Sequence, residues 1–248
     1  SRGLVGSEMC IRDRFMSSAG RARAVLTKHV LEGCVLALFL VIGAGAPAAH
    51  PADPTGTPAA DKAALQSTLP AGIAAAEAGR LSEAITILTP HAKRGNATAN
   101  YALGLIYMRG TGDAATAAKL SHRHFRNAAQ RGHVGAVFEV AFQFERGIGT
   151  EPDVKRAIRL YRLAARSNHL NAQYNLAVLL SSGSGVDPDL PQAYFWATAA
   201  HHNAVRSPNP VLTETRTRGL ARTIRARLPY QQAAKASTAA AKLTGQPI

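Results

Sequence analysis

Apolar residues recur every three to four positions along the middle of the chain, which is the spacing of one face of an α-helix. Leu103, Ile106 and Tyr107 illustrate the pattern. Alanine is abundant, and it loses little side-chain entropy in a helix. We therefore expect an all-α fold, with helices of this pattern over roughly 97–109, 134–146 and 170–182.

The helical pattern repeats itself. Residues 133–141 (HVGAVFEVA) align with residues 169–177 (HLNAQYNLA) at an offset of 36, and residues 99–104 (ANYALG) match the earlier of these copies at an offset of 37. A half copy precedes them, since residues 84–92 align with 157–165 at an offset of 73. Such a period is typical of a solenoid, in which stacked helical hairpins bury apolar faces that one hairpin cannot bury alone.

Each copy predicts two helices joined by a Gly-x-Gly turn. Glycine ends the first helix because it readily takes the left-handed conformation of a C-cap. The second helix is expected to start at Thr116, Asp153 or Asp189, whose side-chain oxygens can cap free backbone N–H groups, with Gln192 completing a capping box at the third site. Small residues recur at one position of the first helix and indicate close approach of adjacent helices: Gly104, Ala141 and Ala177.

These residues resemble the Sel1-like repeat family, a relative of the tetratricopeptide repeat. The resemblance rests on an alanine, a Leu-Gly pair, a tyrosine and the Gly-x-Gly turn, followed by an aspartate and a closing Ala-Ala. The middle copy is looser, with Val140 in place of leucine and Phe144 in place of tyrosine. The resemblance covers about 80–203 and implies a right-handed α-α superhelix, a solenoid of helix-turn-helix repeats that serves as a scaffold or adaptor.

The segment 204–248 departs from the repeat. Pro208 and Pro210 interrupt the chain, and helices are expected around 211–227 and 230–243. Their apolar residues can close the exposed end of the stack, which makes the segment a helical cap; these residues are Leu212, Leu220, Ile224 and Leu228. We therefore predict a solenoid over 69–203, with a half repeat at 69–95, repeats at 96–132, 133–168 and 169–203, and basic capping helices at 204–248.

The N-terminal region has the order of a secretory signal peptide. Residues 1–15 are interpreted as a non-native or disordered leader, because 6–14 (GSEMCIRDR) resembles translated adapter sequence. From Met16 a basic stretch, a short apolar run and Ala46-Pro47-Ala48 follow in turn, so 16–48 is predicted to be a signal peptide and 49–68 a flexible linker. Both cysteines, Cys10 and Cys34, precede the cleavage site. We expect a periplasmic or secreted protein, the alternative being an uncleaved anchor in the inner membrane.

Net charge is +14 and favours anionic partners. Much of it falls in the C-terminal segment, where an Arg-rich stretch is a candidate anion-binding patch, the alternative being the solvated face of a capping helix. Export argues against nucleic acid as the partner. The candidate anion-binding residues are Arg216, Arg218, Arg222 and Arg225.

No pattern of a catalytic or cofactor site stands out. His133 and His169 occupy equivalent repeat positions, which indicates a structural role, and His122-x-His124 and His201-His202 lack companion ligands at metal-binding spacing. The glycine-rich turns follow helices and lack the Gly-Lys-Ser/Thr of a phosphate loop. We therefore expect neither an enzyme, nor a cofactor, nor a metal site.

In stacked helical repeats the first helices line a groove, and residues at i, i+4 and i+7 share a helix face. One such face varies between the copies, as a binding groove allows and as ordinary surface drift would too. Its candidate partner-binding residues are Ala102, Ile106 and Arg109, then Glu139, Gln143 and Arg146, then Asn175 and Leu179 with Ser182.

These observations favour a non-enzymatic scaffold of the cell envelope that holds a partner protein or peptide in the solenoid groove, in signalling or envelope assembly. One alternative is a cell-wall-acting or peptide-hydrolysing enzyme that carries the same repeats. The other is a membrane-anchored protein that binds anions through its Arg-rich tail.

Overall fold

The computed structural model describes residues 58–206 and 212–245, with side chains from Thr68 onward. The expected leader, the signal peptide, both cysteines, Pro208 and Pro210 lie outside the described residues.

Within these ranges the chain forms ten α-helices and no strand, which confirms the all-α fold class. Each repeat is a pair of antiparallel neighbours, and we call α4, α6 and α8 the A helices and α5, α7 and α9 the B helices. The helices are α2 (Pro58–Glu77), α3 (Leu81–Lys93), α4 (Ala97–Met108), α5 (Ala114–Gln130), α6 (Val134–Arg146), α7 (Val154–Arg166), α8 (Leu170–Ser182), α9 (Leu190–Arg206), α10 (Glu214–Arg225) and α11 (Tyr230–Thr244).

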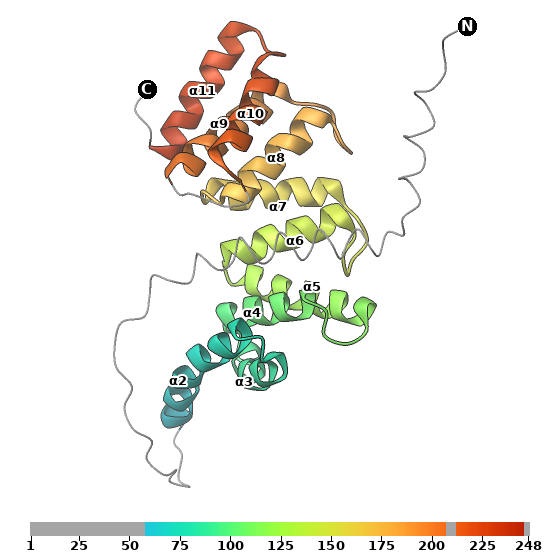
Figure 1. The fold of residues 1–248 in the computed structure, drawn as a ribbon, viewed down its shortest axis with the longest axis vertical. Helices are drawn as coiled ribbons and strands as arrows, with labels where there is room; N and C mark the ends of the chain where they lie inside the picture. The colour runs from blue at the N-terminus through green and yellow to red at the C-terminus, as the bar shows by residue number, and fades with distance from the viewer. Residues whose placement is uncertain (1–57, 207–211, 246–248) are drawn as a thin grey trace, which may run out of the picture. The chain divides into compact units, whose positions relative to one another are not determined.

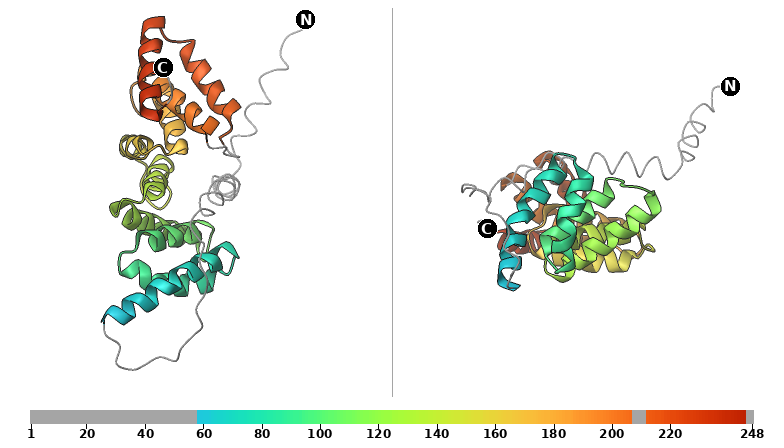
Figure 2. Two further views of the ribbon diagram at one scale, coloured as in Figure 1. Left: turned by 90° about the vertical axis from the view of Figure 1, so that its left-hand side faces the viewer. Right: turned by 90° about the horizontal axis from the view of Figure 1, so that it is seen from below.

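The helices stack in chain order. Every helix from α2 to α9 packs against the next, and α9 then contacts both α10 and α11 (Figure 1). Figure 2 shows α2 and α3 at one end of this stack and α10 and α11 at the other. The tandem helix-turn-helix arrangement is that of a solenoid, in which each hairpin is stabilised by its neighbours.

The A helices begin where the sequence predicts, and glycine caps the ends of α6 and α8, whereas the C-cap of α4 is Arg109 in the right-handed conformation. Asn96, His133 and His169 are their N-caps, and each side chain accepts a hydrogen bond from the backbone N–H three residues on. Gly147 and Gly183 are left-handed C-caps, with φ of 68° and 71°. The Gly-x-Gly turns therefore end α6 and α8 as expected, because glycine has no Cβ to oppose a positive φ.

Aspartates cap the B helices. Asp153 and Asp189 accept from the N–H groups of Arg156 and Gln192, as predicted. The expected start at Thr116 is wrong: Asp113 is the cap, and the N–H of Thr116 donates to its carboxylate. A carboxylate directly after the turn captures the free N–H groups before the threonine hydroxyl can.

The capping box expected at Asp189 forms only in part. Gln192 does not reach back to the backbone N–H of Asp189, which instead donates to the carbonyl of Leu180. The Gln192 amide donates to the Asp189 carboxylate at 2.7 Å. The Asp189 carboxylate therefore accepts hydrogen bonds from both the backbone N–H and the side-chain amide of Gln192, and the helix start is still capped.

The first hairpin is larger than expected. Helix α2 begins at Pro58, so residues 58–68 are helical and do not belong to a linker. Proline is favourable in the first turn of a helix, where its missing N–H has no partner to lose. Together α2 and α3 form a whole hairpin, although only α3 carries the repeated sequence.

The first A helix has a glycine at position 104 because an aromatic ring, and not a neighbouring backbone, packs against it. A Cβ added to Gly104 would lie 2.5 Å from ring carbons of Phe125, which is fully buried. The carbonyl of Gly104 also accepts a hydrogen bond from the Ser121 hydroxyl at 3.0 Å. The expected close approach is therefore real, and it is made by side chains of α5.

The C-terminal helices cover the last repeat. Leu212, Ile224 and Leu228 are buried as predicted, whereas Leu220 is only half-buried. Helix α10 starts at Glu214, behind the N-cap Thr213, and α11 follows Pro229. Among the described helices, none combines the length and the apolar character that crossing a lipid bilayer requires.

Candidate partner-binding surface

The face predicted to bind a partner is largely buried. Ile106 is 1% exposed, Gln143 is 0% exposed and Leu179 is 6% exposed. Each A helix packs against its own B helix and against helices of the neighbouring copies, so its free arc is narrow. Ile106, Gln143 and Leu179 therefore point into the stack, whereas other residues of the predicted face keep part of their surface.

Gln143 shows what this buried face does. Its amide donates to the Ser121 hydroxyl at 3.1 Å, and its carbonyl oxygen pairs with Nδ1 of His122 at 2.9 Å. Because Ser121 in turn donates to Gly104, one chain of hydrogen bonds joins α4, α5 and α6. Gln143 therefore holds two repeats together and is not free to bind a partner.

The other predicted residues are placed variously. Ala102 and Asn175 are half-buried, and the Asn175 amide donates to the Tyr161 hydroxyl at 3.2 Å. Arg109 and Arg146 are exposed at the C-terminal ends of their helices, and so is Ser182. The structure thus does not bring the predicted set together on one open surface.

The accessible face of the A helices lies one position earlier and is apolar. Two positions recur in all three copies, and five of the six side chains are half-buried, while Val178 is 36% exposed. Sequence reasoning missed these residues because aromatic side chains at helical spacing indicate a core. The signal was their recurrence at offsets of 37 and 36. This set, called the apolar row below, comprises Tyr101 and Leu105, Phe138 and Phe142, and Tyr174 and Val178.

The aromatic residues of the row are held by the next element along the stack. The ring of Tyr101 stacks on His133, with centroids 4.2 Å apart, and Phe138 stacks on His169 at 4.7 Å. In the third copy the Arg216 guanidinium lies 5.5 Å from the Tyr174 centroid and donates to its hydroxyl. The structural role predicted for the two histidines is confirmed.

The arginines beside the apolar row are engaged within the chain. Arg109 donates to the carbonyl of Ala76 at 3.0 Å. Arg146 pairs with the Glu145 carboxylate at 3.2 Å and lies 5.7 Å from the Phe142 centroid. Glu145 also accepts from the Tyr161 hydroxyl at 2.8 Å. The local positive charges are therefore balanced or hydrogen-bonded.

Glu139 is different from these neighbours. It is 8% exposed, and within the described part of the chain its carboxylate has neither a hydrogen bond nor an ion pair. Burial alone raises the pKa of Glu139 to about 7. A carboxylate removed from water without a partner is costly, so its protonated form is favoured.

The candidate anion-binding arginines all lie on α10, and most of them make contacts within the chain. Arg216 reaches back to Tyr174, Arg218 pairs with Glu214, and Arg225 donates to the carbonyl of Leu228 while covering Tyr230. Arg222 is exposed on α10. Three of the four are thus occupied by contacts that hold the C-terminal cap.

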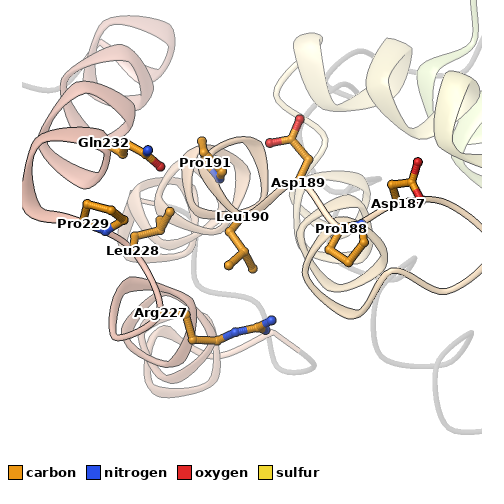
Figure 3. A pocket seen from close by; sticks show the side chains of 9 residues that line it. All are labelled: Asp187, Pro188, Asp189, Leu190, Pro191, Arg227, Leu228, Pro229 and Gln232. Atoms are coloured by element: carbon orange, nitrogen blue, oxygen red, sulfur yellow. The ribbon is translucent and has the colours of Figure 1, made fainter.

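An open depression of about 500 Å³ lies between the start of α9 and the turn from α10 to α11. Figure 3 shows the carboxylates of Asp187 and Asp189 on the α9 side and the Arg227 guanidinium on the other. Arg227 donates to the carbonyl of Ser181 at 3.1 Å. Proline and leucine side chains make up much of the wall: Pro188, Leu190, Pro191, Leu228 and Pro229.

The histidines considered as metal ligands have other partners. His124 pairs with Asn100 at 3.0 Å, and His202 pairs with the Thr244 hydroxyl at 3.0 Å. Across the residues that the structure describes, no group of three His, Cys, Asp or Glu side chains is placed to hold a metal ion.

A family model described as the Sel1 repeat matches residues 97–133, 135–169 and 170–200. The chain therefore carries three Sel1 repeats, which confirms the resemblance seen in its sequence. Such repeats generally act as scaffolds for protein–protein interaction.

Two bacterial repeat proteins are among the solved structures similar to the chain. A protective antigen present in uropathogenic Escherichia coli strains, which displays an SLR fold, is 26% identical with a TM-score of 0.58 over 66% of this chain and 33% of that one. A Sel1 repeat protein from Oxalobacter formigenes is 22% identical with a TM-score of 0.48 over 71% and 77%. This chain spans about a third of the length of the first protein. No curated protein matches it.

Proposed function

We propose that this protein is a non-enzymatic scaffold that binds a segment of a partner protein along the apolar row. The observation that carries the proposal is the recurrence of partly exposed apolar side chains at equivalent positions of three stacked A helices. Stacked repeats present such positions side by side, so an extended or helical segment can contact several copies at once.

The arrangement of the row suits binding more than chemistry. Its aromatic rings are fixed by His133, His169 and Arg216, so little side-chain entropy is lost when a partner docks. Rigid aromatic side chains are also the residues that most often dominate binding energy at interfaces.

The cell envelope is the proposed place of action. The support is the order of basic, apolar and small residues over 16–48, which is that of an exported protein. A protein exposed to protease in spheroplasts but protected in intact cells supports this location, whereas protection in both argues for a cytoplasmic one.

Site-specific photo-crosslinking in living cells tests the binding surface. A photoreactive residue at Val178 on α8 is expected to capture a discrete partner. The matched control is Leu163 on α7, which is also apolar and is more exposed, at 56%. Crosslinks of equal yield from both positions, or from Leu163 alone, contradict the proposed surface.

The partner identified in this way allows a quantitative test. Val178→Asp places a charge in the row and is expected to weaken binding about tenfold or more, since a desolvated charge without a partner costs well over 1 kcal/mol. Leu163→Asp introduces the same charge away from the row and is expected to leave the affinity unchanged. Equal losses in both variants overturn the proposal.

A further inference from the structure

The buried carboxylate of Glu139 invites a comparison between copies of the repeat. Ala102, Glu139 and Asn175 occupy one position of the A helices, at offsets of 37 and 36. In the first copy the position holds an alanine, which has no polar group. In the third copy it holds an asparagine whose amide makes a hydrogen bond. The fold itself therefore does not require a carboxylate at this position.

The third copy shows where this position points. Asn175 of α8 donates to the Tyr161 hydroxyl of α7, so the side chain turns toward the preceding repeat. Glu139 of α6 also lies near this hydroxyl, because its charge helps to raise the pKa of Tyr161. The Tyr161 hydroxyl donates to Glu145 instead, so Glu139 is left without the hydrogen bond that Asn175 makes.

The position also borders the apolar row. Glu139 follows Phe138 directly and lies three residues before Phe142, and both of these are partly exposed. It retains 8% of its surface, so the side chain is at the edge of the groove and not sealed inside. A group docked on the row can therefore reach the carboxylate.

We propose that Glu139 is the contact for a basic side chain of the bound partner segment, an arginine or lysine flanked by apolar residues that lie along the apolar row. This inference rests on the function proposed above and deepens it. An incoming cation supplies the counter-charge and the hydrogen bonds that the carboxylate lacks within its own chain.

The surrounding charges agree with this choice of partner. Arg146 is neutralised by Glu145, and Arg109 is hydrogen-bonded to Ala76. Glu145 is already used by Arg146 and by the Tyr161 hydroxyl. Among the described residues on this side of α6, Glu139 is therefore the ionisable group whose partner is missing. Burial raises the pKa of Glu139, as expected for a carboxylate without a counter-charge.

Peptide selection on the purified full chain tests the inference without a known partner. A random library of 12-residue peptides is displayed against the wild-type protein, and peptides that Val178→Asp no longer binds are retained as binders of the row. We expect these peptides to be enriched for arginine or lysine between apolar residues. Selection on Glu139→Gln is expected to lose that basic preference while keeping the apolar one.

A double substitution then measures the contact itself. In a selected peptide the basic residue, an arginine for example, is replaced by citrulline, its neutral isostere. On the wild-type protein this is expected to weaken binding about tenfold or more, as for a hydrogen bond between charged groups. On Glu139→Gln the same change is expected to have less than about a twofold effect. Glu83→Gln, an exposed carboxylate on α3 with the same change in net charge, is the control and retains the wild-type response.

The outcomes separate the two proposals. Row-binding peptides without a basic preference, or a citrulline effect that persists in Glu139→Gln, overturn the role of Glu139 and leave the row intact. A library that yields no peptide sensitive to Val178→Asp overturns the proposed function and this inference with it. Glu139→Ala, which copies Ala102, is a second variant with the same expected result should the glutamine perturb the helix.

Discussion

His169 stacks its ring on Phe138 of the preceding repeat, with centroids 4.7 Å apart and 25° between the planes. The Nδ1 atom of the same ring accepts a hydrogen bond from the N–H of Ala172 and caps helix α8. His133 stands in the same relation to Tyr101 and caps α6. One side chain thus starts an A helix and fastens it to an aromatic residue of the apolar row.

Removing His169 is expected to destabilise the protein through both contacts. His169→Ala should lower the free energy of unfolding by about 2 kcal/mol, roughly half from the lost cap and half from the lost ring contact. His169→Asn keeps a capping oxygen and should lose about half as much. Urea unfolding followed by circular dichroism measures the difference. Equal losses in the two variants contradict the capping role.

Acid is expected to weaken the same contact. Burial, with a smaller contribution from the charge of His133, lowers the pKa of His169 from 6.5 to about 4. The unfolded chain therefore binds more protons between these values, so the stabilisation is complete above pH 6.5 and is lost as the pH falls toward 4.

The pH dependence can be isolated with the His169→Asn variant. Other histidines shift in the same direction, His124 among them, so the wild-type melting temperature should fall on acidification in any case. The gap in melting temperature between wild type and His169→Asn should narrow from pH 7.5 to pH 4.5. A gap that stays constant over this range shows that His169 does not contribute.

The stability contributed at Glu139 is expected to change with pH in the opposite direction to that at His169. Burial raises the pKa of Glu139 from 4.5 to about 7, so its stabilising protonated form is fully present below pH 4.5 and is lost as the pH rises through 7. Glu139→Gln should therefore be more stable than wild type at pH 8, by about 1 to 3 kcal/mol, and about equal to it at pH 4. Urea unfolding at both pH values measures this. A variant that is less stable at pH 8 indicates a partner for the carboxylate within the chain.

Gly104 is expected to tolerate no larger residue. The Cβ of alanine would meet the Phe125 ring at 2.5 Å, and such overpacking costs about 1 to 3 kcal/mol. Gly219 in α10 is the matched control, because nothing lies within 4 Å of its added Cβ. Gly219→Ala should instead stabilise the protein by about 0.5 to 1 kcal/mol, the ordinary helix propensity difference. Thermal unfolding of both variants distinguishes the two effects.

The local features of the fold could be predicted from the sequence. The A helices, their Gly-x-Gly ends and the caps at Asp153 and Asp189 depend on side chains close along the chain, which act on backbone groups a few residues away. The family resemblance depends on the same spacing. Even here the start expected at Thr116 was wrong, because the cap is Asp113, three residues earlier, and the length of the preceding turn decides which residue caps the helix.

The binding surface was decided by the tertiary structure. A helical face can be recognised from its period, but which face stays open depends on how many neighbours pack around it. Gln143 was therefore predicted to lie in the groove and is instead fully buried with His122 and Ser121, and the apolar row was not predicted as a surface. The missing hydrogen bond at Glu139 is also a tertiary fact, because the nearby Tyr161 hydroxyl donates to Glu145 instead. Sequence determined the hairpins and their repetition because those rest on local forces, and stacking alone determined which side chains remained for a partner.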